Sequence, residues 1–252
     1  MNQGSISIPR NNYFASLELL RQNKVPISTV VDIGCADGTF SLNCLRILSR
    51  ELQIVNIDAQ NIYEDSLRKI QSKIGGHYKI SGITAYEGKM KFSIGKHPYW
   101  MASGRDVEKY EYIDCYKLDT VLEEFQDMGP YLIKMDIEGA EFSALQGAEL
   151  TLENTSVLIL ETNIYYGRDV SGNFSDTYSF LASRNFSLFD ITNFGYRHED
   201  QVLYQIYAVY INKKYEFRHQ WVSTGMENAL LDSMKQRRKN RLEMNEQILA
   251  GL

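Results

Sequence analysis

The chain has 252 residues, of which 44% are hydrophobic and 23% charged, so it can bury a sizeable core and is typical of one large globular domain. Its formal net charge of −5 argues against general affinity for nucleic acid, which requires a basic face to neutralise phosphates. One cluster is basic, KQRRKNR at residues 235–241. We interpret it as the solvated side of a terminal helix, and the alternative is a contact with a polyanion.

The three cysteines, at positions 35, 44 and 115, cannot pair completely and lack CxxC spacing, which argues against a disulfide framework or a zinc site. A reducing compartment fits this composition. The N-terminal run MNQGSISIPRNN has no apolar core of signal-peptide length, and no window offers the roughly eighteen uninterrupted apolar residues of a membrane helix. The sequence therefore predicts a cytoplasmic protein that does not insert into a membrane.

Short β-branched runs alternate along the chain with longer segments of helical spacing. Between the runs at residues 28–33 and 52–58, apolar residues follow a helical period, which predicts a βαβ unit. Further strands are predicted at residues 78–83, 131–136, 156–161, 186–191 and 204–211. Helices are predicted at residues 119–125, 138–150 and 177–184. Strands that alternate with helices predict an α/β fold with a mostly parallel sheet covered by helices on both faces.

Two segments interrupt the alternation. Glu87 and Gly88, within AYEGKMKFSI, have the character of a hairpin turn, and residues 95–106 form a long loop. No Pro/Gly/Ser-rich linker divides the chain, so we expect a single domain over residues 1–225. Residues 226–252 predict a C-terminal helix whose interrupted apolar stripe either folds back on the body or contacts another subunit. Because closed two-fold dimers are the commonest oligomers, we expect this helix to support a homodimer.

The run VVDIGCADGTF, residues 30–40, predicts a strand that ends in a glycine-bearing turn and leads into a helix. A dinucleotide site would show GxGxxG, whereas here Gly34 and Gly38 are four positions apart. Asp32 and Asp37 would repel an anionic pyrophosphate but not a cationic ligand. S-adenosylmethionine combines an ammonium, a sulfonium and an adenosine, and the D-x-G-x-x-x-G turn resembles the first motif of class I methyltransferases.

Asp58 ends the second predicted strand and suits the ribose of this ligand, because a carboxylate accepts two hydrogen bonds from a diol. Glycines at a strand–turn–helix junction also occur for packing alone. The presence of Asp58 favours the cofactor site over that alternative.

The second informative stretch is YLIKMDIEGAEFSALQGAEL, residues 131–150. Lys134 and Asp136 lie on one face of its apolar strand, because strand side chains alternate with period two. A lysine in a central parallel strand is costly unless it has a partner or a task, and Asp136 falls at the carboxyl end, where open α/β sheets bind ligands. Glu138 and Glu141 follow in the first turn of the next helix, where they either serve the reaction or favour the helix N-terminus through its dipole.

The K-x-D-x-E-G-A-E core of this stretch, preceded by YKLDTVLEE at residues 116–124 and followed by LILETN at residues 158–163, resembles the signature of the FkbM family of S-adenosylmethionine-dependent methyltransferases. The resemblance covers roughly residues 28–211. It implies a class I, Rossmann-like sheet with an antiparallel last strand, and methylation of a hydroxyl oxygen on a sugar-containing acceptor or secondary metabolite. The chain departs from many relatives in having NIDAQ after the second strand, where they carry an acid followed by proline.

Carried over to this chain, the resemblance implies two groups of site residues. The cofactor group is Asp32, Gly34, Cys35, Ala36, Asp37, Gly38, Asp58, Ala59 and Ile83. The reaction group is Lys134, Asp136 and Glu138. A sulfonium loses positive charge in the transition state, so a carboxylate touching it would stabilise the ground state more, and the acids should serve the acceptor instead. We expect Asp136 or Glu138 to take the hydroxyl proton, and Lys134 to orient them or the acceptor.

Polar residues at the same edge of the sheet allow two further interpretations. Asp136, Glu161 and Asn163 offer only oxygen ligands at the ends of adjacent strands, a set that suits Mg²⁺ or another hard cation, although the family need not use a metal. His198, in a loop before the last strand, either acts as a base or faces solvent.

Tyr99 and Trp100, in the long loop, either stack on a sugar ring or anchor the loop itself. Two rival functions also stay open. A non-catalytic module that binds S-adenosylmethionine is disfavoured by the acids at the strand ends. A nicotinamide-dependent oxidoreductase is disfavoured by Asp32 and by the lack of GxGxxG.

Overall fold

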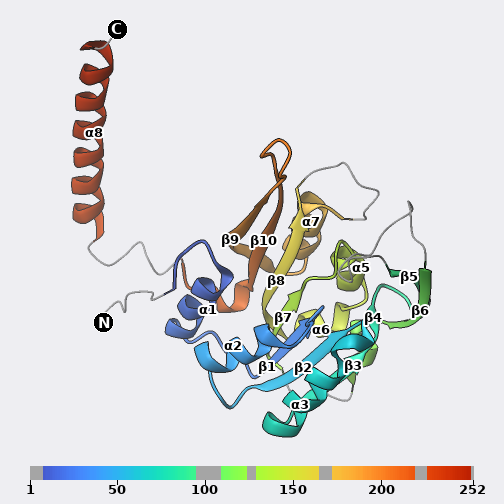
Figure 1. The fold of residues 1–252 in the computed structure, drawn as a ribbon. Helices are drawn as coiled ribbons and strands as arrows, with labels where there is room; N and C mark the ends of the chain where they lie inside the picture. The colour runs from blue at the N-terminus through green and yellow to red at the C-terminus, as the bar shows by residue number, and fades with distance from the viewer. Residues whose placement is uncertain (1–7, 95–108, 124–128, 165–171, 219–225, 251–252) are drawn as a thin grey trace. The chain divides into compact units, whose positions relative to one another are not determined.

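The computed structural model describes residues 8–94, 109–123, 129–164, 172–218 and 226–250 (Figure 1). The chain divides into two compact units, Met1–Tyr215 and Glu216–Leu252. The first unit contains both sheets and all the predicted site residues, and the second contains one long helix.

The first unit is built on a seven-stranded sheet in the order β3-β2-β1-β7-β8-β10-β9. Neighbouring strands from β3 to β8 pair in parallel, whereas β10 lies between β8 and β9 and runs antiparallel to both. The strands are β1 (Thr29–Ile33), β2 (Gln53–Asp58), β3 (His77–Ile80), β7 (Tyr131–Met135), β8 (Thr155–Asn163), β9 (Phe186–Tyr196) and β10 (Leu203–Asn212). This arrangement confirms the predicted Rossmann-like sheet with an antiparallel last strand.

The central strands are buried on both faces. Every residue of β1 and of β7 is buried, whereas the edge strand β3 is partly exposed along its length. A parallel strand covered on both faces has a nearly continuous apolar sequence, which explains why TVVDI and YLIKM were recognisable. Their register places Asp32 beside Lys134, so the two charged residues of these strands are neighbours.

Helices cover both faces of this sheet (Figure 1). On one face, α2 contacts β1 and packs against α1, and on the other α5 contacts β8 and α4 contacts α6. The helices are α1 (Tyr13–Gln22), α2 (Thr39–Ile47), α3 (Glu64–Ile74), α4 (Leu118–Val121), α5 (Glu141–Gln146), α6 (Glu149–Glu153) and α7 (Phe174–Ser183), with short 3₁₀ turns η1 (Asn61–Tyr63) and η3 (Lys213–Tyr215).

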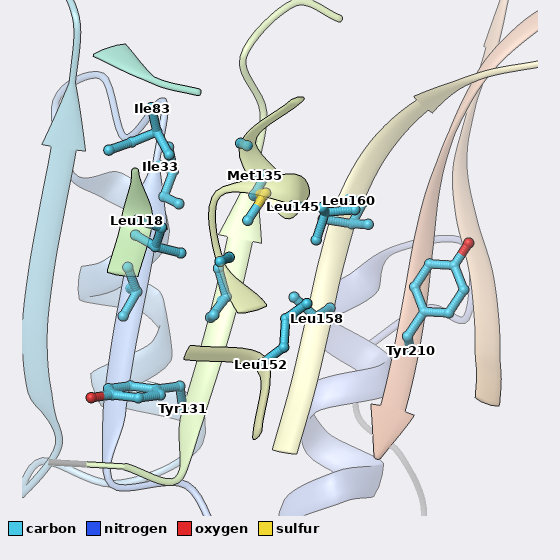
Figure 2. Close-up of a cluster of buried hydrophobic side chains, with 14 of the residues drawn as sticks. Ile33, Ile83, Leu118, Tyr131, Met135, Leu145, Leu152, Leu158, Leu160 and Tyr210 are labelled. Atoms are coloured by element: carbon cyan, nitrogen blue, oxygen red, sulfur yellow. The ribbon is translucent and has the colours of Figure 1, made fainter. Parts of the chain in front are cut away.

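Figure 2 shows the buried cluster between the sheet and the helices α4, α5 and α6. The sheet contributes Ile33, Met135 and Leu158, and the helices contribute Leu145 and Leu152. Each fully buried aliphatic side chain of this kind contributes about 1.5 to 3 kcal/mol through removal from water. The cluster therefore fixes the carboxyl ends of the central strands, from which the site residues project.

A smaller, three-stranded sheet lies in the order β4-β6-β5, with β4 (Gly82–Ile83) parallel and β5 (Gly88–Ile94) antiparallel to β6 (Lys109–Tyr116). Two predictions are wrong here. The strand expected at residues 78–83 is divided between β3 and β4, which belong to different sheets. The hairpin expected at Glu87 and Gly88 is absent because β6 pairs between β4 and β5 and supplies the hydrogen bonds of both.

The helix expected at residues 138–150 is interrupted. Helix α5 ends before Gly147, and α6 begins at Glu149. A side chain at Gly147 would place its first carbon 2.2 Å from the carbonyl oxygen of Thr84, so the break brings the chain against the start of the small sheet. Helices α1 and α3 and strand β6 were not predicted.

In the second unit, α8 (Met226–Ala250) begins where the C-terminal helix was expected. The side chains of residues 232–244 are all exposed within the chain, including the basic cluster at residues 235–241 and the apolar Met234, Leu242 and Met244. Among the described helices, none combines the length and the apolar character that crossing a membrane requires.

Candidate functional site

A cavity of about 210 Å³ lies at the carboxyl ends of β1, β2 and β7 and is bordered by the small sheet. This is the edge at which open α/β sheets bind ligands. Its lining includes predicted residues from both the cofactor group and the reaction group: Gly34, Ala36, Asp58, Ala59, Ile83, Asp136 and Glu138. The structure therefore brings the two predicted groups together around one cavity.

The turn after β1 has the backbone conformation that its glycines indicate. Gly34 has φ +73° and Gly38, the N-cap residue of α2, has φ +80°. The N–H groups of Gly34 and Cys35 donate to the carbonyl oxygen of Ile57, at 2.8 and 3.2 Å. These two bonds hold the turn against the end of β2, and Gly34 is among the residues that line the cavity.

Asp58 joins the turn after β1 to the loop after β2. Its Oδ2 accepts a hydrogen bond from the N–H of Ala36 and its Oδ1 accepts one from the N–H of Gln60, both at 2.8 Å. Burial raises the pKa of Asp58, although the two backbone donors oppose this. Since a carboxylate has about four acceptor positions, Asp58 keeps capacity for further donors in the cavity that it lines.

Four residues of the predicted cofactor group do not line the cavity. Asp32 is fully buried because it faces α2, where Ser41 donates to it at 3.3 Å. Cys35 is buried, and Gly38 is the N-cap residue of α2. Asp37 is exposed, and its Oδ1 accepts a hydrogen bond from the N–H of Thr39. These four residues shape the turn from outside the lining.

Lys134 has the partners that its central position requires. Its Nζ lies 3.0 Å from Oδ2 of Asp136 and 3.8 Å from Oδ1 of Asp32. Burial alone would lower the pKa of Lys134, but the two carboxylates outweigh burial and raise it. Burial raises the pKa of Asp32 to about 6 against the opposing effect of Lys134. The lysine is thus a charged link between the end of β7 and the middle of β1.

Asp136 has a second donor that sequence analysis missed. The hydroxyl of Tyr207, on β10, donates to its Oδ2 at 2.6 Å. The Tyr207 ring packs against Tyr13 at the start of α1, with centroids 5.1 Å apart. Burial would raise the pKa of Asp136, but Lys134 and the hydrogen bond from Tyr207 lower it below its usual value. Asp136 is therefore ionised near neutral pH.

Asp136, Glu138 and Glu161 form a cluster in which one carboxylate oxygen of each lies within 4.8 Å of the others. Burial, followed by the charge of Asp136, raises the pKa of Glu161 to about 9. Of the predicted metal ligands, the cluster contains Asp136 and Glu161, with Glu138 as a third acid. Asn163 lies two residues beyond Glu161 on β8, and therefore on the same face of the strand.

The loop after β7 has an unusual backbone conformation. Glu138, which is exposed, has φ +55°, and Gly139 has φ +99°. Glu141 is buried, and its Oε1 accepts hydrogen bonds from the N–H groups of Ile137 and Gly139, at 2.8 and 3.3 Å. Burial raises the pKa of Glu141 to about 7 despite these donors. Glu141 therefore holds the loop that presents Glu138 through these two hydrogen bonds. Its role goes beyond the favourable interaction of an acid with a helix dipole.

The remaining sequence candidates lie elsewhere. His198 is exposed in the turn between β9 and β10 and does not line the cavity. Tyr99 and Trp100 lie outside the described residues.

Comparison with solved structures finds methyltransferase folds at low sequence identity. Methyltransferase FkbM from Methylobacillus flagellatus KT is 19% identical, with a TM-score of 0.49, over 72% of this chain and 43% of that chain. The chain thus spans less than half the length of that protein. Magnesium protoporphyrin IX methyltransferase from Synechocystis PCC 6803 is 13% identical (TM-score 0.43; 79% of this chain, 77% of that chain). An O-methyltransferase from Bacillus cereus is 11% identical (TM-score 0.45; 83% and 84%).

No curated protein matches the sequence significantly. The model of one protein family, described as the methyltransferase FkbM domain, matches residues 32–188. This match is more than half of the chain, and it extends from the glycine turn through Asp58 to the acids at the ends of β7 and β8. The chain therefore belongs to the FkbM family of methyltransferases.

Proposed function

We propose that the protein is an S-adenosylmethionine-dependent O-methyltransferase that methylates a hydroxyl of a sugar-containing or secondary-metabolite acceptor. The observation that carries this proposal is the single cavity lined by the glycine turn and Asp58 on one side and by Asp136 and Glu138 on the other. A methyl donor and an acceptor must meet in one place, and this cavity offers groups suited to each.

The residues on the donor side fit the cofactor. Asp58 lines the cavity with acceptor capacity left for the ribose hydroxyls. The apolar side chain of Ile57, from the main sheet, faces the same space as Ile83, Met90 and Phe92 from the small sheet, and together they suit a purine ring. Gly34 and Ala36, from the turn after β1, line the same cavity and would contact the methionine portion.

The cofactor would supply a methyl group on a sulfonium, and this chain's residues would align and deprotonate the acceptor. Asp136 is ionised and so can accept a hydrogen bond from the acceptor hydroxyl. Either Asp136 or Glu138 takes the proton in our proposal, and Lys134 orients Asp136. Most of the acceleration of an in-line displacement should come from alignment, since a well-oriented pair avoids the entropy cost of a bimolecular encounter.

A hard cation is a further part of the proposal. Asp136, Glu161 and Asn163, with Glu138 beside them, would hold Mg²⁺ through oxygen atoms. Such an ion would lower the pKa of an acceptor hydroxyl bound to it.

The cellular compartment is also part of the proposal. Cys35, Cys44 and Cys115 are all free and buried, which supports a reducing, cytoplasmic compartment.

The test combines binding and turnover. Calorimetric titration should show binding of S-adenosylmethionine and S-adenosylhomocysteine but not NADH, and nucleotide sugars and cell extracts should be screened with a radiolabelled methyl donor. Asp136→Asn keeps the side-chain shape and removes the charge, so it should lower the turnover number at least tenfold while the cofactor dissociation constant stays within about twofold. Unchanged turnover with the true acceptor would remove Asp136 from the reaction.

A further inference from the structure

Two donors from different strands meet at one oxygen of Asp136. Lys134, two residues earlier on β7, lies 3.0 Å from Oδ2, and the Tyr207 hydroxyl donates to the same atom at 2.6 Å. In the sheet order, β8 lies between β7 and β10, so the Tyr207 side chain reaches across β8 to arrive there. The contact joins residues 71 positions apart in the sequence.

The surroundings of Tyr207 hold it in place. Its backbone is paired with Glu161 on one side and Thr192 on the other, so the residue belongs to the interior of the sheet. Its ring packs against Tyr13, whose ring in turn packs edge-on against Phe40 at 5.8 Å. A tyrosine side chain has only two rotatable torsions, so a packed ring presents its hydroxyl with little remaining freedom.

Lys134 alone would not fix the carboxylate. Its ammonium is also 3.8 Å from Asp32, and a long lysine side chain can follow a carboxylate that rotates. A second donor on a packed ring restricts that rotation, because Oδ2 must stay within reach of both groups. Glu161 also forms a hydrogen bond with this carboxylate, so Lys134 and Tyr207 are not its only side-chain partners.

We propose that Tyr207 is a positioning residue for methyl transfer: with Lys134 it fixes Oδ2 of Asp136 and so holds the carboxylate in the orientation that meets the acceptor hydroxyl. The proposal rests on the proposed function for the reaction itself. It adds a residue from β10 to a site whose other acids lie at the ends of β7 and β8.

The same strand provides a matched control for the hydroxyl of Tyr207. Tyr210 points into the apolar cluster of Figure 2, and among the described residues its buried hydroxyl has no hydrogen-bond partner. Tyr207→Phe and Tyr210→Phe therefore remove the same atom from the same strand, once at the site and once in the core.

The experiment measures turnover, binding and structure for both variants. Tyr207→Phe should lower the turnover number about 10- to 100-fold, because a small misplacement of a reacting group costs up to about 100-fold. The acceptor KM and the dissociation constant of S-adenosylmethionine should stay within about twofold. Tyr210→Phe should match the wild type in all three. Crystal structures should show the Asp136 carboxylate rotated, or in two conformers, in Tyr207→Phe alone.

Two results would overturn the proposal. One is an unchanged turnover number in Tyr207→Phe, or a loss explained entirely by weaker cofactor binding or by a lower melting temperature. The other is an Asp136 carboxylate that keeps its position in the variant crystal. If the wild-type protein methylates no acceptor, the proposed function fails, and the crystal structures still decide whether Tyr207 fixes Asp136.

Discussion

Gly34 and Asp136 lie so close together that a methyl group on Gly34 would stand 1.9 Å from the carbonyl oxygen of Asp136. The turn proposed to hold the cofactor thus packs directly on the backbone that carries the proposed reaction residue. No side chain at position 34 fits this contact, and the obstacle is a backbone atom that cannot rotate away. The distance between the two halves of the site depends on this glycine.

Gly34→Ala should therefore destabilise the protein by more than its backbone conformation alone explains. Gly75→Ala provides a comparison without a clash: its φ of +76° is also positive, its ψ of −157° lies in a region nearly exclusive to glycine, and nothing lies within 4 Å of an added carbon. Alanine at a positive φ costs about 1 to 2 kcal/mol, and the clash at position 34 should add at least about 2 kcal/mol. Urea unfolding followed by circular dichroism measures both. A loss in Gly34→Ala of no more than about 2 kcal/mol, the backbone cost alone, would contradict the close packing.

Asp58→Ala should weaken binding of S-adenosylmethionine by about 1 to 3 kcal/mol, because hydrogen bonds from the ribose to a charged acceptor are lost. Isothermal titration calorimetry measures this change directly. Asp65→Ala removes an acid that is exposed on α3 and outside the cavity lining, and it should bind the cofactor like the wild type. Equal affinity in Asp58→Ala and wild type would remove Asp58 from the site.

The buried strands of this fold could be predicted because their sequences are almost continuously apolar. The runs that became β1, β2, β7, β8 and β10 were found within a few residues of their limits. The same rule placed Asp58 and Asp136 correctly at strand ends, since a polar residue that interrupts such a run marks the edge of the sheet, whereas β8 continues two residues beyond Glu161. Strand β6, with the sequence KYEYIDCY, mixes charged and apolar residues and gave a weaker signal.

The partners of those acids could not be predicted. A strand pattern shows which residues share a face, but it does not show which strand lies next to which. Tyr207 reaches Asp136 only because β10 is inserted between β8 and β9, and Tyr13 joins them from a helix near the start of the chain. The burial of Asp32 under α2 likewise depends on packing between elements, which spacing along the sequence does not reveal.

The stability of the protein should fall as pH rises from about 4 to 7, in part through Glu141. Its pKa is raised to about 7 in the folded state by burial, above the value of about 4.3 in an unfolded chain. The folded state then binds more protons than the unfolded state in this interval, so the free energy of unfolding decreases as pH rises, by about 3 kcal/mol for this residue.

Glu141→Gln removes this titration and keeps an oxygen that can accept from Ile137 and Gly139. Urea unfolding between pH 4.5 and 7.5 should therefore show a flatter pH dependence in Glu141→Gln than in wild type. Glu149→Gln, at an exposed position at the start of α6, should follow the wild-type curve. Parallel curves for wild type and Glu141→Gln would show that Glu141 does not titrate in this range.

Activity should depend on a divalent cation if the acid cluster binds one. Treatment with EDTA should abolish methyl transfer, and Mg²⁺ in the millimolar range should restore it. Glu161→Gln replaces one proposed ligand by a neutral group and should raise the Mg²⁺ concentration needed for half-maximal activity at least tenfold. Full activity of the EDTA-treated protein would show that the acids act without a metal.

Helix α8 should support self-association, because exposed apolar residues such as Met234 and Leu242 lie along it. Light scattering at tens of micromolar should give a dimer for the full chain and a monomer for a chain ending near Ser223. A monomer in both cases would exclude the dimer. A dimer that survives truncation would show that another surface is responsible.

The insertion of β10 between β8 and β9 has a consequence for biosynthesis. In the described sheet β9 pairs with β10 alone. Because β9 precedes β10 in the chain, it leaves the ribosome first and has no strand to pair with until β10 follows. During this interval the edge of β8 is unpaired, which is a risk for aggregation. The donor from β10 also reaches Asp136 late, after the glycine turn and Asp58 have long been translated. A nascent chain that stops before β10 therefore contains the cofactor side of the site but lacks part of its reaction side.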